Sequence, residues 1–148
     1  MVVSGDIEVR VARVHEDAKL PTRGSIHAAG WDLYALEDTT VPYRTATLVR
    51  TGLHVAIPVG YEGQVRARSS LGKKGLIPPH GIGTIDADYR GEVGVILVNL
   101  SSEDFVIEDG ERIAQMVIAK HEQAEWIHVE ILDESERGDG GFGSTGVK

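Results

Sequence analysis

Apolar residues recur mostly at every second position, and this alternation constrains the fold more than any other feature of the sequence. It is clear in Leu53, Val55 and Ile57 and again in Val65 and Ala67. Because successive side chains of a β-strand point to opposite faces of a sheet, a period of two indicates strands with one buried face. The same period predicts strands near both ends of the chain, at Ile7, Val9 and Val11 and at Ile127, Val129 and Ile131.

Turn-forming stretches separate these segments at short intervals: LPTRGS, TTVPY, IPVGYEG, IPPHGIG and SSEDF. Short strands divided by such turns are typical of an all-β sandwich or barrel. One short helix is expected near 69–75, where serine can cap the start and Gly75 can end it. The run GEVGVILVNL at 91–100 is apolar on both faces, which predicts a central strand and leaves its outer side for a second subunit.

Length and charge limit the classes of function. A chain of 148 residues fits one domain, and its lack of cysteine excludes disulfides, a thiolate nucleophile and cysteine-bound zinc. A net charge of −8 argues against binding nucleic acid, so a polyanionic ligand needs a local basic cluster. The first residues lack the pattern of a targeting signal and no run is long enough for a membrane span, so we expect a cytoplasmic protein without membrane contact.

The glycine-rich stretch RGDGGFGSTG near the end of the chain has two interpretations. It is not a phosphate-binding P-loop, because Val147 stands where lysine is required. A frayed terminus is one alternative. The other is a lid, in which Phe142 offers an aromatic plane, Arg137 a positive charge and the glycines close approach to an anion. We therefore divide the chain into a β-domain, 1–136, and a flexible arm, 137–148.

Two further stretches combine polar groups with apolar neighbours. AGWDLYA places Asp32 in an apolar setting, either as a turn residue or as a functional carboxylate. VRARSSLGKKG gathers basic and hydroxyl side chains at the expected helix start, which suits an anion but also a solvated turn.

Two other stretches carry candidate acid–base and amide groups. In GTIDADYRGE, Asp86 and Asp88 share one face if the segment is extended, whereas a hairpin turn explains them equally well. ERIAQMVI sets Gln115 among core residues, where its amide needs hydrogen-bond partners. The six histidines lack zinc-binding spacing and the serines lack a nucleophile-elbow sequence, so an acid–base site acting on a phosphate fits best.

Taken in order, AGWDLYA, RARSSLGKKGL, GTIDADYRGEV, ERIAQMVI and RGDGGFGSTG resemble the five motifs of the homotrimeric dUTPase (dUTP diphosphatase) family. The resemblance implies a jelly-roll (β-clip-like) subunit and a homotrimer whose active sites draw on all three chains, with the arm closing on a neighbouring site. It also implies Mg²⁺-assisted hydrolysis of dUTP to dUMP and pyrophosphate by in-line attack of water on the α-phosphate. That reaction limits uracil in DNA and supplies dUMP for thymidylate synthesis.

The resemblance assigns roles to individual residues. Asp86 matches the catalytic aspartate that orients the water, and Asp32 the aspartate linked to the water shell of the metal, with Mg²⁺ held mainly by phosphates and water. Tyr89 matches the tyrosine under the deoxyribose. The remaining matched positions are uracil-reading Gly83, Thr84 and Ile85; phosphate-binding Arg68, Ser69, Ser70 and Gln115; and, in the arm, Arg137, Phe142, Gly143, Ser144 and Thr145.

Two positions depart from the family pattern. His80 stands where an asparagine commonly contacts uracil, so substrate affinity could depend on pH, and Ser70 replaces a common glycine. Two alternative functions remain. A dCTP deaminase-like enzyme shares the fold but needs a glutamate where this chain has Ile96, and a non-catalytic trimeric module has no need for Asp86 and Tyr89 together with the arm.

Overall fold

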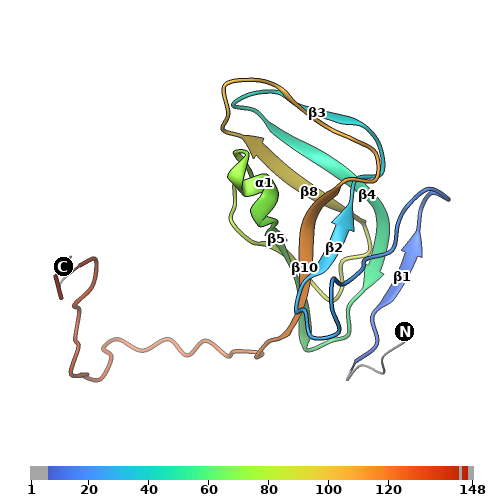
Figure 1. The fold of residues 1–148 in the computed structure, drawn as a ribbon. Helices are drawn as coiled ribbons and strands as arrows, with labels where there is room; N and C mark the ends of the chain where they lie inside the picture. Colours follow the sequence, from blue (N-terminus) through green and yellow to red (C-terminus); the bar gives the residue numbers. More distant parts are fainter. Residues whose placement is uncertain (1–6, 144, 147–148) are drawn as a thin grey trace.

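The computed structural model describes residues 7–143 and 145–146. Figure 1 shows a β-rich body from which the C-terminal segment runs outward. The elements in chain order are β1 (Arg10–Arg13), β2 (Trp31–Tyr34), β3 (Thr39–Val41), β4 (Ala46–Ala56), β5 (Tyr61–Ala67), α1 (Ser69–Lys73), β6 (Leu76–Ile77), β7 (Gly83–Ile85), β8 (Glu92–Asn99), β9 (Phe105–Ile107) and β10 (Arg112–Lys120).

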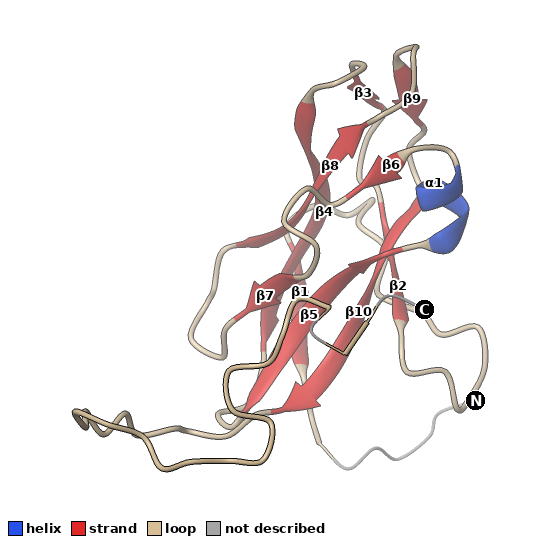
Figure 2. Cartoon of the chain, turned by 90° about the vertical axis from the view of Figure 1, so that its left-hand side faces the viewer, coloured by secondary structure: helices blue, strands red, loops and turns tan. Residues whose placement is uncertain are grey.

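The strands form two four-stranded sheets, one in the order β1-β4-β8-β6 and the other in the order β2-β10-β5-β7. Strands β3 and β9 make a separate two-stranded sheet at one end of the body (Figure 2). Paired strands are antiparallel, and several pairs, such as β2 with β10 and β4 with β8, join distant parts of the chain. This arrangement is a jelly roll, as the all-β pattern and the resemblance predicted.

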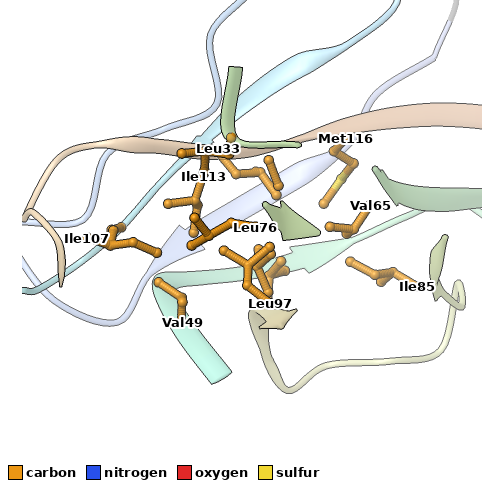
Figure 3. Close-up of a cluster of buried hydrophobic side chains, with 14 of the residues drawn as sticks. Leu33, Val49, Val65, Leu76, Ile85, Leu97, Ile107, Ile113 and Met116 are labelled. Carbon is orange, nitrogen blue, oxygen red and sulfur yellow. The ribbon is translucent and has the colours of Figure 1, made fainter. Parts of the chain in front are cut away.

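The inner faces of the two sheets share one hydrophobic core (Figure 3). In β8 the buried positions alternate with more exposed ones, so Val93, Val95 and Leu97 point inward. Val65 and Met116 face them from the other sheet. The alternation of apolar residues therefore determines which face of each strand is buried and which face is available to bind a ligand. As predicted, the 91–100 run forms a central strand, paired with β4 and β6.

Helix α1 lies where it was expected, but its cap was predicted incorrectly. The N-cap residue is Arg68, and no side chain caps the helix by a hydrogen bond. Gly75 follows the helix with a φ of +90°, a conformation that costs glycine little, so the predicted stop is confirmed.

The strand predictions at the two chain ends hold only in part. β1 begins at Arg10 and its four residues are exposed, so only Val11 of the predicted alternating set lies in it. The segment around Ile127, Val129 and Ile131 is not a strand, and all three side chains are exposed. A strand needs a partner for its backbone hydrogen bonds, and this segment leaves the body without meeting one in the described part of its own chain (Figure 1). Within the described residues, no helix has the length and apolar character required to cross a membrane.

Candidate active site

A pocket of about 480 Å³ opens where β4 and β8 meet β5 and β7. Six residues that the resemblance placed at the substrate lie in its wall: His80, Gly83, Thr84, Ile85, Asp86 and Tyr89. Ile85 faces the core, whereas Asp86 and Tyr89 are exposed to solvent. The structure therefore brings together one part of the predicted site.

A tight turn carries Asp86 and Tyr89. The backbone N–H of Tyr89 donates to the carbonyl of Asp86 at 3.1 Å, so this segment is a turn and not an extended strand. The turn joins β7 to β8, which lie in different sheets, so it is not the hairpin turn of the sequence-based alternative. The hydroxyl of Tyr89 donates to the carbonyl of Glu92 at 2.8 Å, where β8 begins. A carboxylate and an aromatic ring thus project from one turn at the pocket.

His80 belongs to the loop that leads into β7. A Cβ built on Gly83 would lie 3.2 Å from the Cε1 atom of His80, so the imidazole packs against the backbone of this strand. Both residues line the pocket, and His80 is exposed. The position suits a ring nitrogen that hydrogen-bonds a planar polar ligand.

An ion pair forms another part of the pocket wall. The Nε and Nη2 atoms of Arg50 each donate to the carboxylate of Glu92 at 3.0 Å. These hydrogen bonds and the positive charge hold the pKa of the Glu92 carboxyl below its ordinary value, whereas Glu92 raises the pKa of the Arg50 guanidinium. Sequence reasoning missed both residues, because β4 and β8 come together only in the fold.

A second group of predicted residues lies on the outer face of the other sheet. Asp32 of β2 is half-buried between two guanidinium groups, with Arg68 Nε at 3.5 Å and Arg112 Nη1 at 3.8 Å. Asp32 is therefore a strand residue and not a turn residue. Sequence reasoning also missed Arg112. Its position three residues before Gln115 could have indicated a further basic group near the predicted site.

Gln115 completes this group. In the strand register it stands opposite Asp32 on one side and opposite Arg66 on the other, so the three share one face of the sheet. Its Nε2 donates to the carbonyl of Ala67 at 3.4 Å. Gly30 lies so close that a Cβ built there would be 1.9 Å from Gln115 Oε1. Carboxylate, amide and guanidinium groups are thus held in a row suited to an anion and its counterions.

The other predicted phosphate ligands lie in two places. Ser69 and Ser70 are exposed in the first turn of α1, directly after Arg68. Arg137 bonds its own arm, with Nε donating to the carbonyl of Gly140 at 2.6 Å. Phe142 is fully exposed, and Gly143 and Thr145 are exposed beside it, while Ser144 lies outside the described residues. In Figure 1 the arm is far from the body of its own chain.

One chain therefore presents three separated groups: the pocket, the row on β2, β10 and the end of β5, and the arm. The described lining of the pocket includes no residue of the other two groups. Fold and site together define a class: a jelly-roll protein with a pocket that contains a carboxylate and an aromatic ring, and with a separate basic row that suits a phosphorylated ligand.

The comparisons make the class specific. The sequence profile of the dUTPase family matches residues 16–146, and the chain belongs to this family. It is 52% identical to the deoxyuridine 5'-triphosphate nucleotidohydrolase of Syntrophotalea carbinolica, over 95% of this chain and 97% of the relative. The predicted family is thereby confirmed.

Solved structures agree with this assignment. A mutant of the dUTPase of Staphylococcus bacteriophage 80alpha, solved with dUpNHpp, is 29% identical with a TM-score of 0.89, over 95% of this chain and 99% of that one. A mutant dUTPase of phage phi11 of S. aureus, whose structure describes coordination of a structural Mg(II) ion, is 25% identical with a TM-score of 0.77, over 84% and 98%.

Proposed function

We propose that this protein hydrolyses dUTP to dUMP and pyrophosphate, as a homotrimer in the cytoplasm. The observation that carries the proposal is the turn that presents Asp86 and Tyr89 at one pocket, in a chain of the dUTPase family. The name of the Syntrophotalea relative states this substrate and this class of reaction.

Asp86 acts as the residue that orients the attacking water and accepts its proton. Its carboxylate is exposed at the pocket, and no ion pair or side-chain hydrogen bond within the described residues occupies it. A carboxylate free to bind water is what a general base requires. Tyr89 packs under the deoxyribose and leaves no space for a 2'-hydroxyl, while the backbone of β7 and His80 meet the base.

The phosphates bind to the row on the second sheet. Arg68 and Arg112 both lie within ion-pair distance of Asp32, which keeps two guanidinium groups oriented before the substrate arrives. Preorganised cations stabilise the charge that develops as pyrophosphate leaves. Gln115, Ser69 and Ser70 add neutral hydrogen bonds. The arm, 137–148, then closes so that Phe142 covers the base and Arg137, Gly143, Ser144 and Thr145 meet the terminal phosphate.

Mg²⁺ accompanies the substrate and adds charge neutralisation at the phosphates. The described residues contain no group of three or more histidine, aspartate or glutamate side chains that could cage a metal. Mg²⁺ commonly keeps water and phosphate oxygens as its ligands, so such a cage is not required. Asp32 is the residue that would hold water of its shell, because two arginines already balance its charge.

We propose a trimer because the pocket, the β2/β10 row and the arm of one chain lie apart from one another. The β2/β10 row and the arm must reach the pocket of another subunit to complete a site. The sequence after β10 also carries Trp126, Ile127, Ile131 and Leu132 with large exposed surfaces, which is costly unless another chain covers them. On the outer face of β4 and β8, Leu48 and Ile96 are exposed apolar residues that suit the same purpose.

The test is pyrophosphate release from dUTP, dTTP, UTP and dCTP, each with and without Mg²⁺, by the parent and by Asp86→Asn. We expect hydrolysis of dUTP alone, stimulated by Mg²⁺, and a loss in Asp86→Asn of about 100-fold or more at unchanged fold. Deamination of dCTP would support the deaminase alternative, and binding without turnover would support a non-catalytic module. Either result contradicts the proposal.

A further inference from the structure

We infer that the ion pair of Arg50 and Glu92 is a positioning device that holds the turn bearing Asp86 and Tyr89 in its productive place. The inference rests on the proposed function. It assigns a role to Arg50 and Glu92, which have none in that proposal. Both residues line the pocket, and the Glu92 carboxylate accepts two hydrogen bonds from the Arg50 guanidinium.

An irregularity in β4 creates the place for this pair. Arg50 stands opposite Gly94 and His54 stands opposite Glu92, so β4 spans four positions where β8 spans two. The extra length is taken up at Gly52, whose φ of +72° is disfavoured for other residues. The Gly52 N–H points at the Glu92 carboxylate at 3.4 Å, so backbone and guanidinium hold the same group.

Further contacts fix the positions of both strands around the ion pair. The hydroxyl of Thr51 donates to the carbonyl of Val93 at 2.5 Å, which fixes the bulge against β8 on the buried side. On the other side, Glu37 approaches Arg50 at 3.7 Å. Arg50 thus faces two carboxylates and the bidentate contact goes to Glu92, a geometry that only a guanidinium provides.

Glu92 is the point where the catalytic turn joins the sheet. Residues 86–91 lie outside β7 and β8, so they lack the ladder hydrogen bonds that fix strand residues. Tyr89 donates its hydroxyl to the backbone of Glu92 at 2.8 Å, and its ring lies over Gly91, where a Cβ would meet the phenol oxygen at 2.3 Å. A shift of Glu92 therefore moves Tyr89 with it.

A second contact from the same part of β4 supports the turn. The Nδ1 atom of His54 lies 2.5 Å from the carbonyl of Arg90, which accepts its hydrogen bond. Arg90 in turn donates to the carbonyl of Ala87 at 2.6 Å, inside the turn. Arg50 and His54, on the two sides of the β4 bulge, thus bind Glu92, where β8 begins, and Arg90, near the end of the turn.

The charges identify Arg50 as a positioning residue rather than a phosphate ligand. Its guanidinium is paired with Glu92 and near Glu37, so two carboxylates already offset its charge. A phosphate near Arg50 would also lie near these two carboxylates, which repel it. Loss of the pair is therefore expected to disturb the placement of Asp86 and Tyr89, while the basic row that binds the phosphates stays intact.

The experiment compares steady-state dUTP hydrolysis by Glu92→Gln, Arg50→Met and the double variant. We expect each single variant to lower kcat about tenfold with KM changed less than about threefold, because a misplaced water-orienting group slows the chemical step. The double variant should be no slower than the slower single variant, since both changes remove one shared contact. Arg50→Lys keeps the charge without the bidentate contact and should fall between the parent and Arg50→Met.

Glu8→Gln is the matched control. It breaks an exposed ion pair, with Arg10 Nε at 3.2 Å from Glu8 Oε1, that lies outside the pocket and should leave both constants unchanged. Circular dichroism and thermal unfolding show which variants are folded. If Arg50→Met or the double variant does not fold, Arg50→Lys still tests the inference. Unchanged kcat in folded Glu92→Gln or Arg50→Lys, a change confined to KM, or multiplying losses in the double variant would overturn the inference. An inactive parent instead contradicts the proposed function.

Discussion

The close approach of Gly30 to Gln115 gives a sharp test of our proposal that the row on β2 and β10 binds the phosphates. In the variant Gly30→Ala, the added methyl group would lie 1.9 Å from Gln115 Oε1, 2.8 Å from Cδ and 3.3 Å from Cβ. The obstacle is a side chain and not the backbone. The whole Gln115 side chain must therefore turn away, while β2 and β10 keep their register.

The magnitude follows from these distances. Ordinary contact begins near 3.4 Å, so the amide oxygen must retreat by about 1.5 Å. A displacement of about 1 Å at a positioning group can cost about 100-fold in rate, and we expect a loss of kcat of that order. Stability should change little. The lost hydrogen bond to Ala67 costs about 0.5–1.5 kcal/mol, and alanine at a compatible backbone returns about 0.4–1 kcal/mol.

The assay is continuous pyrophosphate release from dUTP, paired with thermal unfolding at matched protein concentration. A net change within about 1 kcal/mol shifts the Tm by no more than about 2–4 °C. Gly24→Ala is the control, because nothing lies within 4 Å of a Cβ at this position. A Gly30→Ala enzyme whose kcat stays within about twofold of the parent would refute the role of Gln115 placement.

The remaining predictions concern the arm, the ion pair and the histidine. Deleting residues 137–148 should leave the assembled fold but remove most turnover, because solvent is no longer excluded from the site; unchanged hydrolysis contradicts this. Since Arg50 lowers the pKa of Glu92, the pair stabilises the fold above the unfolded-state pKa of about 4.3, and that stability is lost as pH falls through the lower folded-state pKa. Urea unfolding should therefore separate the parent from Glu92→Gln at neutral pH and much less in acid. Substrate affinity should be weaker in His80→Ala than in the parent, because alanine cannot hydrogen-bond the base, and equal affinities would exclude a role for His80.

The strands inside the body were predictable because each has both an alternating apolar pattern and a neighbouring strand to pair with. The alternation over Leu53 and Val55 reappears as buried positions of β4, and the 91–100 run becomes a central strand. At 127–131 the pattern is equally clear, but no strand forms there in the described part of the chain. Alternation indicates which side chains should be buried. A strand also needs a neighbouring backbone for its hydrogen bonds, and the local sequence does not show whether such a neighbour is present.

The helix cap shows a different limit. Serine is a favourable cap residue, but the cap position is set by where the chain leaves β5, and this falls at Arg68. The strand ends at Ala67, so the residue that follows takes the cap position whatever its side chain. Local preference was overruled by the preceding strand.

The grouping of candidate site residues was predictable where the residues are near in sequence or lie on paired strands. Asp86 and Tyr89 lie on one turn because they are near in sequence, and Asp32 meets Gln115 because their strands pair. Arg50 and Glu92 are 42 positions apart, and their contact depends on a bulge that no spacing rule indicates. Positions that support a site from a distance are therefore the ones that sequence reasoning misses.

The position of Trp126 has a practical consequence. The chain has two tryptophans: Trp126 is 95% exposed after β10, whereas Trp31 is half-buried with the Arg23 guanidinium 4.3 Å above its ring. If neighbouring subunits cover the outlying segment, the emission of Trp126 moves to shorter wavelength while that of Trp31 stays constant. Dilution would reverse the change by mass action. In the proposed trimer, Trp126 would therefore report association by its fluorescence, without an added label.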